Sequence, residues 1–251
     1  MFKPFKLIAC LILLCLYSCS SVYVPNVPNT PMLSSQGEFS GGAHISLRGN
    51  ANFNGAYAVS NHVGVLLGGA YMNSERRRKD LNYKLVEIGG GYFTAFGPDK
   101  NRILEIYAGL GTGKTNRSFR EYNSGDLIST ELQVTEYSKT FLQVNYSSKK
   151  NNNFHLFGNN YPLNYGTALR ISHVSMDNFF INGVGTPKED NIFLEPIFFT
   201  RMRLSDAVQL QYTTSSNFGL KNRKYMTAGN SIFSVGAVIN VGGIKKKKVQ
   251  E

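Results

Sequence analysis

Seven charged residues stand at alternating positions within segments that are otherwise apolar or rich in glycine. Charges withdrawn from water are costly unless they pair, so three carboxylates and four cations facing the same way predict ion pairs. Two interpretations follow. The charges form salt bridges that fill the interior of the fold, or they line a charged constriction that favours anions. This inward charge cluster comprises Glu87, Glu105, Lys139, Arg170, Glu195, Arg201 and Arg203.

Basic residues also gather in predicted loops. Arg76, Arg77, Arg78 and Lys79 follow one another directly, and a second basic group lies near 221–224. Charges in loops are usually solvated, and a second interpretation is contact with an anionic glycan or with the phosphates of lipid A, through simple charge attraction. The terminal run of lysines at 245–248 is interpreted as a solvated tail.

Other motifs argue against an enzyme. The segment 109–115 resembles a phosphate-binding loop, but Ala108 occupies the position of its first glycine and no helical pattern follows. His173 adjoins Ser172, yet successive residues of a strand point to opposite faces and cannot act together. The other histidines are His44, His62 and His155. We predict no catalytic residues, no metal ligands, no cofactor and no nucleic-acid partner.

The first nineteen residues have the features of a leader. Two lysines precede ten apolar residues at 7–16, and Leu16-Tyr17-Ser18-Cys19 leads into a polar, proline-bearing segment. A membrane-spanning helix needs about twenty apolar residues, so the pattern indicates a secretory signal. The residues before Cys19 resemble a bacterial lipobox, which implies that Cys19 is lipidated and begins the mature chain.

Two alternatives for the leader stay open. Leu7-Ile8-Ala9-Cys10 is a second lipobox candidate, although cleavage there would leave almost no apolar core ahead of it. In the other alternative, Cys19 is an ordinary residue of a signal that is cut elsewhere. Because the remaining cysteine, Cys15, also lies in the leader, the mature chain would contain no disulfide and no cysteine nucleophile.

Composition favours an all-β protein. Charged residues make up only 17% of the chain, and it has 25 Gly, 17 Phe and 14 Tyr but no Trp. Apolar and polar residues alternate from Gly37 onward, as in β-strands, and no helix of ten residues is evident. Ten strands are predicted, near 37–48, 51–60, 62–73, 83–96, 102–115, 131–147, 163–176, 191–204, 207–217 and 231–243.

The predicted connections alternate between long and short. On the far side, those at 74–82, 116–130, 177–190 and 218–230 are long, whereas most near-side connections are tight. Long loops on one side and short turns on the other are typical of outer-membrane barrels. The segment 148–162 is an exception that we expect to extend strand six or seven. The rival interpretation is a soluble lipidated barrel whose apolar face lines a ligand cavity.

Several motifs carry a resemblance to a known group. The segment 23–31, Tyr-Val-Pro-Asn-Val-Pro-Asn-Thr-Pro, and the motifs at 37–39, 56–65 and 87–92 resemble uncharacterised outer-membrane β-barrel proteins of Bacteroidota. The resemblance covers most of the mature chain and implies a fold, but no chemistry. Ser20-Ser21-Val22 lacks the acidic run associated with surface export in that phylum, which implies a lipid anchor on the periplasmic side.

These observations predict an all-β, up-and-down transmembrane β-barrel of about ten antiparallel strands. The expected parts are a lipoprotein signal (1–18), a lipid-anchored extended tether (19–36), the barrel (37–243) and a basic tail (244–251). The expected role is structural or surface-interacting, and paired charges are expected to plug the lumen. The expected location is a Gram-negative outer membrane, whose lipid the protein contacts through its lipid anchor and the barrel surface. The alternatives are a small, weakly anion-preferring channel or ligand transporter, the soluble barrel and, third, a barrel enzyme.

Overall fold

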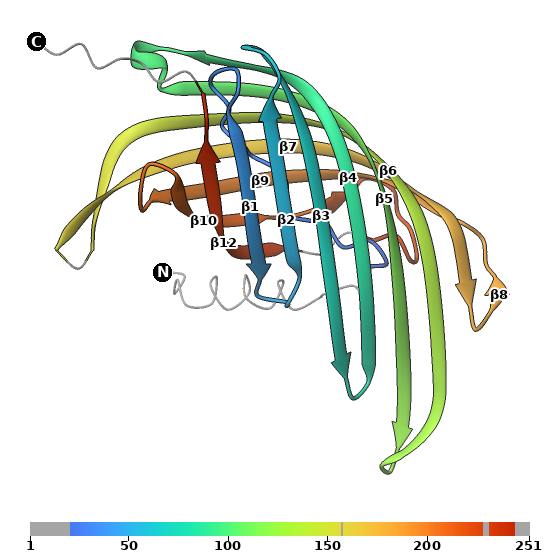
Figure 1. Cartoon of the computed structure of the whole chain (residues 1–251). Coiled ribbons are helices and arrows are strands. Elements are labelled where there is room, and N and C mark those ends of the chain that lie inside the picture. Colours follow the sequence, from blue (N-terminus) through green and yellow to red (C-terminus); the bar gives the residue numbers. More distant parts are fainter. Residues whose placement is uncertain (1–20, 157, 228–230, 244–251) are drawn as a thin grey trace, which may run out of the picture.

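The protein is a closed β-barrel. The computed structural model describes residues 21–156, 158–227 and 231–243. Ten long antiparallel strands form its wall (Figure 1). They are β1 (Phe39–Ser46), β2 (Ala51–Ala58), β3 (Val63–Arg76), β4 (Lys79–Phe96), β5 (Arg102–Asn123), β6 (Asp126–Leu156), β7 (Asn159–Ile181), β9 (Asp190–Arg203), β10 (Val208–Ser215) and β12 (Ile232–Val241). The short elements are β8 (Val184–Gly185), β11 (Phe218–Gly219) and the helical turn η1 (Pro98–Lys100).

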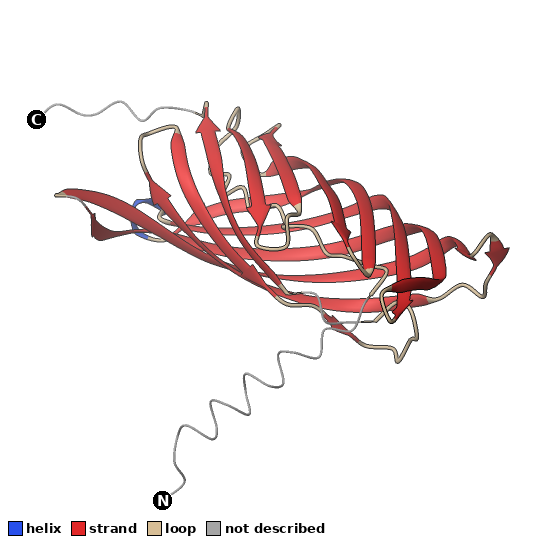
Figure 2. Ribbon diagram, turned by 90° about the horizontal axis from the view of Figure 1, so that it is seen from below, coloured by secondary structure: helices blue, strands red, loops and turns tan. Residues whose placement is uncertain are grey.

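Pairing between the first and last strands closes the wall. Phe39 of β1 lies opposite Val241 of β12, and β7 pairs directly with β9 across the short β8. All of these pairs are antiparallel, and the strands are tilted markedly relative to the barrel axis (Figure 2). Because the ring is closed, its wall leaves no long unpaired strand edge. The predicted fold class is therefore confirmed.

The structure corrects two of the predicted loops. Residues 74–82 and 116–130 are not long loops, because β3, β4, β5 and β6 continue through them to two-residue turns at 77–78 and 124–125. These hairpins project at the lower end of the barrel in Figure 1. The prediction for 148–162 is confirmed, since β6 and β7 extend through it to a turn near Gly158. We call the end that carries the β3–β4 and β5–β6 turns the outer end, and the opposite end the inner end.

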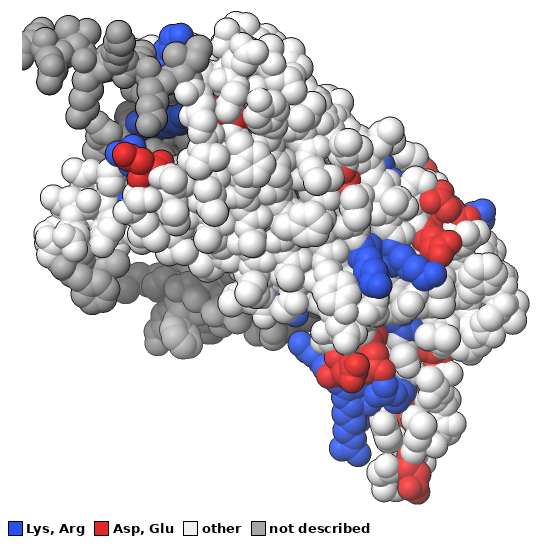
Figure 3. All heavy atoms as spheres, in the orientation of Figure 1, with Lys and Arg blue, Asp and Glu red and all other residues white. Residues whose placement is uncertain are grey.

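The two faces of the wall differ in chemistry. Large apolar side chains such as Ile45, Val65, Leu67, Ile88 and Leu110 are exposed on the outside. Charged residues gather instead over the outer hairpins, and the broad face beside them is largely uncharged (Figure 3). An outward apolar band with charges beyond it suits a wall that is surrounded by lipid. Among the described residues, no helix is long and apolar enough to cross a bilayer.

Candidate functional site

The lumen of the barrel contains the N-terminal part of the same chain. All residues from Ser21 to Leu33 are buried. Tyr23, Val27 and Leu33 are at most 1% exposed, and Tyr23 packs on Tyr137 and Phe193 of the wall. We call residues 21–33 the luminal segment. The sequence predicted an extended tether at 19–36, and the structure shows residues 21–33 of it inside the barrel.

Six residues of the inward charge cluster lie in the lumen, as predicted. Glu87, Glu105, Lys139, Arg170, Glu195 and Arg201 are at most 4% exposed. The seventh, Arg203, is exposed at the inner mouth, because it ends β9 two residues beyond the buried Arg201. Arg203 does point away from the outer surface as predicted, since it lines a cavity at that mouth, but it is not buried with the other six.

Ion pairing within the cluster centres on one carboxylate. Lys139 Nζ lies 3.2 Å from Glu87 Oε2, and Arg170 NH1 lies 3.1 Å from Glu87 Oε1. The amide of Asn26 completes this group, since its Nδ2 donates to Glu87 Oε1 at 2.9 Å and its Oδ1 accepts from Lys139 at 3.3 Å. Two cations on one buried carboxylate, with further hydrogen bonds, meet the requirement that buried charges be compensated. The predicted salt bridges are thus present at Glu87.

The other buried charged side chains form hydrogen bonds with the luminal segment and with nearby polar side chains. Glu105 accepts hydrogen bonds from the backbone N–H of Leu33 at 3.0 Å and from Asn145 Nδ2 at 3.0 Å. Tyr23 donates to Glu195 at 2.8 Å. Arg201 donates to the carbonyl oxygens of Thr30 and Pro31. Many of the buried charges in the lumen are therefore compensated by hydrogen bonds to the luminal segment rather than by ions of opposite charge.

Proline suits the luminal segment to burial. Pro25, Pro28 and Pro31 have no backbone N–H, so at these positions no donor must be satisfied inside the lumen. Side chains of the wall form hydrogen bonds with other backbone groups of the segment. Asn52 Oδ1 accepts from the N–H of Val27 at 3.0 Å, and Gln143 Nε2 donates to the carbonyl of Asn29 at 2.7 Å. The regular spacing of Pro and Asn was the sequence signal for this role, but it carried no information about a partner.

The direction of the luminal segment follows from its contacts. At the outer end, Val22 donates its N–H to the carbonyl of Tyr225 at 3.1 Å and accepts from Thr115 Oγ1 at 2.9 Å. At the inner end, Leu33 reaches Glu105 and the space beside Gly64. The chain therefore enters at the outer end, crosses the lumen and turns into β1 at the inner end. β1 therefore begins at the inner end, and the luminal segment reaches it through the lumen.

A larger cavity lies at each mouth, and a small one of about 10 Å³ lies between them beside Asn29, Thr30 and Arg201. The outer cavity has a volume of about 300 Å³ and is bounded by Ser21, Val24 and Pro25 of the luminal segment. The inner cavity has a volume of about 230 Å³ and is bounded by Pro31, Met32 and Leu33. The two cavities share no lining residue. The buried residues Asn26 to Thr30 of the luminal segment lie between these two mouths.

The basic residues of the β3–β4 turn have separate positions. Arg76 and Lys79 line the outer cavity. Arg77 lies over the ring of Tyr122, 5.1 Å from its centroid, and neither Arg77 nor Arg78 lines the cavity. Sequence reasoning also missed Arg48, which lines the same cavity from the β1–β2 turn. The pairing of β2 with β3, and of β3 with β4, brings that turn beside them.

The remaining candidates do not form a catalytic group. Ser172 is buried in the lumen, whereas the side chain of its neighbour His173 is 47% exposed on the outside. A side chain on Gly109 would meet the ring of Phe141, and one on Gly113 would meet the ring of Tyr137, whereas one on Gly111 would meet Val86 and Glu87. No group of three potential metal ligands occurs among the described residues. Cys19, the leader and Lys245–Lys248 lie outside the described residues.

Comparison with known proteins supports the fold. No family model and no curated protein matches the sequence. Among solved structures, the chain is similar to the translocator domain of the autotransporter NalP from Neisseria meningitidis, with a TM-score of 0.50 and 12% sequence identity. The match covers 83% of this chain and 86% of that domain. At this identity the likeness concerns architecture alone, and it establishes an outer-membrane-type β-barrel fold.

Proposed function

We propose that the chain is an outer-membrane lipoprotein barrel that its own luminal segment keeps closed, with a structural or surface-interaction role rather than a transport role. The observation that carries the proposal is the unbroken burial of residues 21–33. Asn26, Tyr23 and Leu33 bind wall side chains along the lumen, from the outer end to the inner end. A segment fixed at so many points suits a permanent plug.

The plug also bears on the alternative of a small anion-preferring channel. An excess of buried cations would favour anions in an open lumen. Arg201, however, is committed to the carbonyls of Thr30 and Pro31, and Lys139 and Arg170 are committed to Glu87. The cations that would select an anion therefore hold the plug and its neighbours in place.

The proposed lipid anchor belongs at the outer face. Ser21 lines the outer cavity. Cys19 precedes Ser21 by two residues, and two residues of extended chain span at most about 7 Å. A lipid on Cys19 would then insert beside the outer mouth rather than on the periplasmic side. Because the extracellular hairpins of outer-membrane barrels are the longer ones, we assign the outer end to the cell surface.

Conductance of the purified full chain in planar bilayers tests the closed lumen. We expect no steady conductance. A variant with a protease site inserted at the exposed Gln36 provides the comparison, because cleavage there separates the plug from β1. After cleavage and mild urea we expect channels to appear, whereas cleavage at a site inserted between Arg77 and Arg78 should produce none. Steady conductance of the intact chain would overturn the proposal.

The anchor and its side need two further measurements. Labelling with an alkyne fatty acid should mark the wild-type chain and not Cys19→Ala. An epitope inserted after Ser20 should bind antibody on intact cells, and an epitope after Glu251 should bind only after the outer membrane is permeabilised. Absence of fatty-acid label would refute the lipid anchor, and the reverse pattern of epitope access would refute the assigned side.

A further inference from the structure

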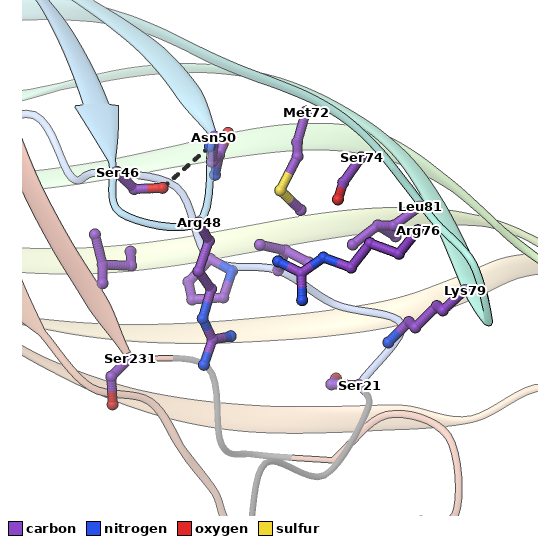
Figure 4. A pocket seen from close by; sticks show the side chains of 13 residues that line it. Ser21, Ser46, Arg48, Asn50, Met72, Ser74, Arg76, Lys79, Leu81 and Ser231 are labelled. Atoms are coloured by element: carbon purple, nitrogen blue, oxygen red, sulfur yellow. Dashed lines mark hydrogen bonds between the residues drawn. The ribbon is translucent and has the colours of Figure 1, made fainter. Parts of the chain in front are cut away.

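The outer cavity has the construction of a binding site. It lies between the luminal segment, the β1–β2 turn, the ends of β3 and β4, and the start of β12. Figure 4 shows Arg48, Arg76 and Lys79 reaching into it from two different hairpins. Its volume of about 300 Å³ is at the lower limit of ordinary small-molecule sites.

The charge at this cavity is of one sign. Arg48, Arg76 and Lys79 line it, and no Asp or Glu is among the described lining residues. The neighbouring acid Asp80 binds Arg120 instead. Burial, and then the charges of Arg117, Arg48 and Arg76, lower the pKa of Lys79, which begins β4 next to the outer turn, beyond the apolar band. Cations held this close together favour an anionic ligand.

Neutral groups complete the lining. Ser21, Ser46, Ser74 and Ser231 contribute hydroxyl groups, and Asn50 contributes an amide. The Asn50 residue is only 4% exposed, and its Oδ1 has no hydrogen-bond partner among the described residues. An acceptor of this kind suits a ligand hydroxyl, because a phosphate oxygen offers it no proton. The apolar side chains of Met72 and Leu81 can cover the hydrophobic face of a sugar ring.

We propose that the outer cavity binds a phosphorylated saccharide, with its phosphate on Arg48, Arg76 and Lys79 and a sugar hydroxyl on Asn50. The phosphate ester can come from a soluble sugar phosphate or from the headgroup of a phosphorylated glycolipid. The inference rests on the proposed function in one respect, namely the assignment of the outer end, where the cavity opens, to the cell surface. Arginine fits a phosphate through paired N–H groups, and lysine adds a point charge.

Calorimetric titration of the detergent-solubilised full chain tests the site at 0.15 M salt. Glucose 1-phosphate should bind saturably and more tightly than inorganic phosphate, which lacks the hydroxyl groups, and unphosphorylated glucose should not bind measurably. Arg48→Gln, Arg76→Gln and Lys79→Gln should each weaken binding about tenfold, the loss expected for one hydrogen bond to a charged group. Absence of saturable binding by glucose 1-phosphate would refute the proposal.

The chain contains a matched control in the same turn. Arg77→Gln and Arg78→Gln remove the same charge from neighbouring positions that do not line the cavity. We expect these variants to bind glucose 1-phosphate as the wild type does. Equal weakening by the lining and the control variants would show general attraction to a basic surface and would overturn the site. Unaltered folding of each variant is checked by the shift of its gel mobility on boiling.

A competition experiment separates the two sources of phosphate. Vesicles of phosphatidylcholine that contain a phosphorylated glycolipid, or its dephosphorylated form, are added during the titration. Competition by the phosphorylated form alone would support a glycolipid headgroup, and absence of competition would support a soluble sugar phosphate. The titration needs neither a closed lumen nor a known cell face, so its failure is distinguishable from a failure of the conductance or epitope experiments.

Discussion

Tyr23 and Glu195 are joined inside the barrel although 172 residues separate them in the chain. The hydroxyl of Tyr23 donates to Glu195 Oε1 at 2.8 Å, and both residues are fully or almost fully buried. Ser172 Oγ is a second, longer donor to the same carboxylate at 3.4 Å. This contact ties the start of the luminal segment to a strand near the end of the wall, so the plug and the closed barrel depend on each other.

Removal of that hydroxyl should loosen both parts. We expect Tyr23→Phe to lower the free energy of unfolding by about 1–3 kcal/mol, because Glu195 loses its short hydrogen bond while it stays buried. Tyr57→Phe is the control, since Tyr57 lies on the outside of the wall and is 46% exposed. The temperature at which gel mobility changes is the measurement. Equal stability of Tyr23→Phe and the wild type would show that Tyr23 does not hold the plug.

The sequence revealed the wall because lipid and lumen impose opposite chemistry on alternate residues. Glu87 and Ile88 illustrate this, since one is buried among polar groups and the other is exposed on the apolar outside. Beyond the bilayer both faces meet water, so the alternation fades, and the hairpin ends near Arg76 and Phe119 were interpreted as loops. Strand continuation there is visible only in the backbone pairing of β3 with β4 and of β4 with β5.

The plug could not be predicted because its contacts are not local. The proline-rich segment has no strand or helix period, and nothing in its sequence identifies Glu105 or Arg201 as partners. Charge parity correctly placed six members of the inward charge cluster in the lumen. It could not show that Asn26, Thr30 and Leu33 would occupy the space between them. The exposed position of Arg203 likewise depends on where the wall ends.

The closed wall should resist detergent. In unheated SDS samples the full chain should migrate at a different position from boiled samples, because every long strand is paired with two neighbours. Gel electrophoresis with and without boiling checks this. No shift, together with release of the protein from membranes by removal of the lipid alone, would favour the soluble lipidated barrel with its apolar face inside.

Gly64 makes room for the inner end of the plug. A Cβ atom on Gly64 would lie 2.8 Å from Leu33 Cδ1 and 3.4 Å from the hydroxyl of Tyr107. We therefore expect Gly64→Leu to displace Leu33 and to expose residues 34–38 to limited proteolysis. Gly55→Leu should be tolerated, since Gly55 has only one atom near this position, at 4.0 Å.

A compensating change makes this test specific. Leu33→Ala in the Gly64→Leu background should restore part of the protection, because the smaller side chain vacates the contested space. Leu33→Ala alone should cost stability through a cavity, by about 2–5 kcal/mol if the site does not relax. If the double variant is cut as fast as Gly64→Leu, the clash with Leu33 is not the cause.

Asp190 fastens the outer loop that covers the start of the plug. It lies at the outer end of β9, beyond the apolar band, and contacts Lys221, Arg223 and His173. Hydrogen bonds from Lys221 and His173 hold the pKa of Asp190 below its ordinary range. The stabilisation is therefore complete above the ordinary pKa of an aspartate, about 4, and it is lost as the pH falls through the lowered value.

Hydrogen exchange of the loop amides at 220–226 measures this fastening. Asp190→Asn should increase their exchange at pH 7, and the difference from the wild type should shrink as the pH falls below about 4. The loop carries Tyr225, whose carbonyl accepts the N–H of Val22, so the same variant should also weaken protection of Val22. Asp99→Asn, in the helical turn η1 at the inner end, is the control and should leave these amides unchanged. A difference that persists undiminished at pH 2 would show that the charge of Asp190 does not hold the loop.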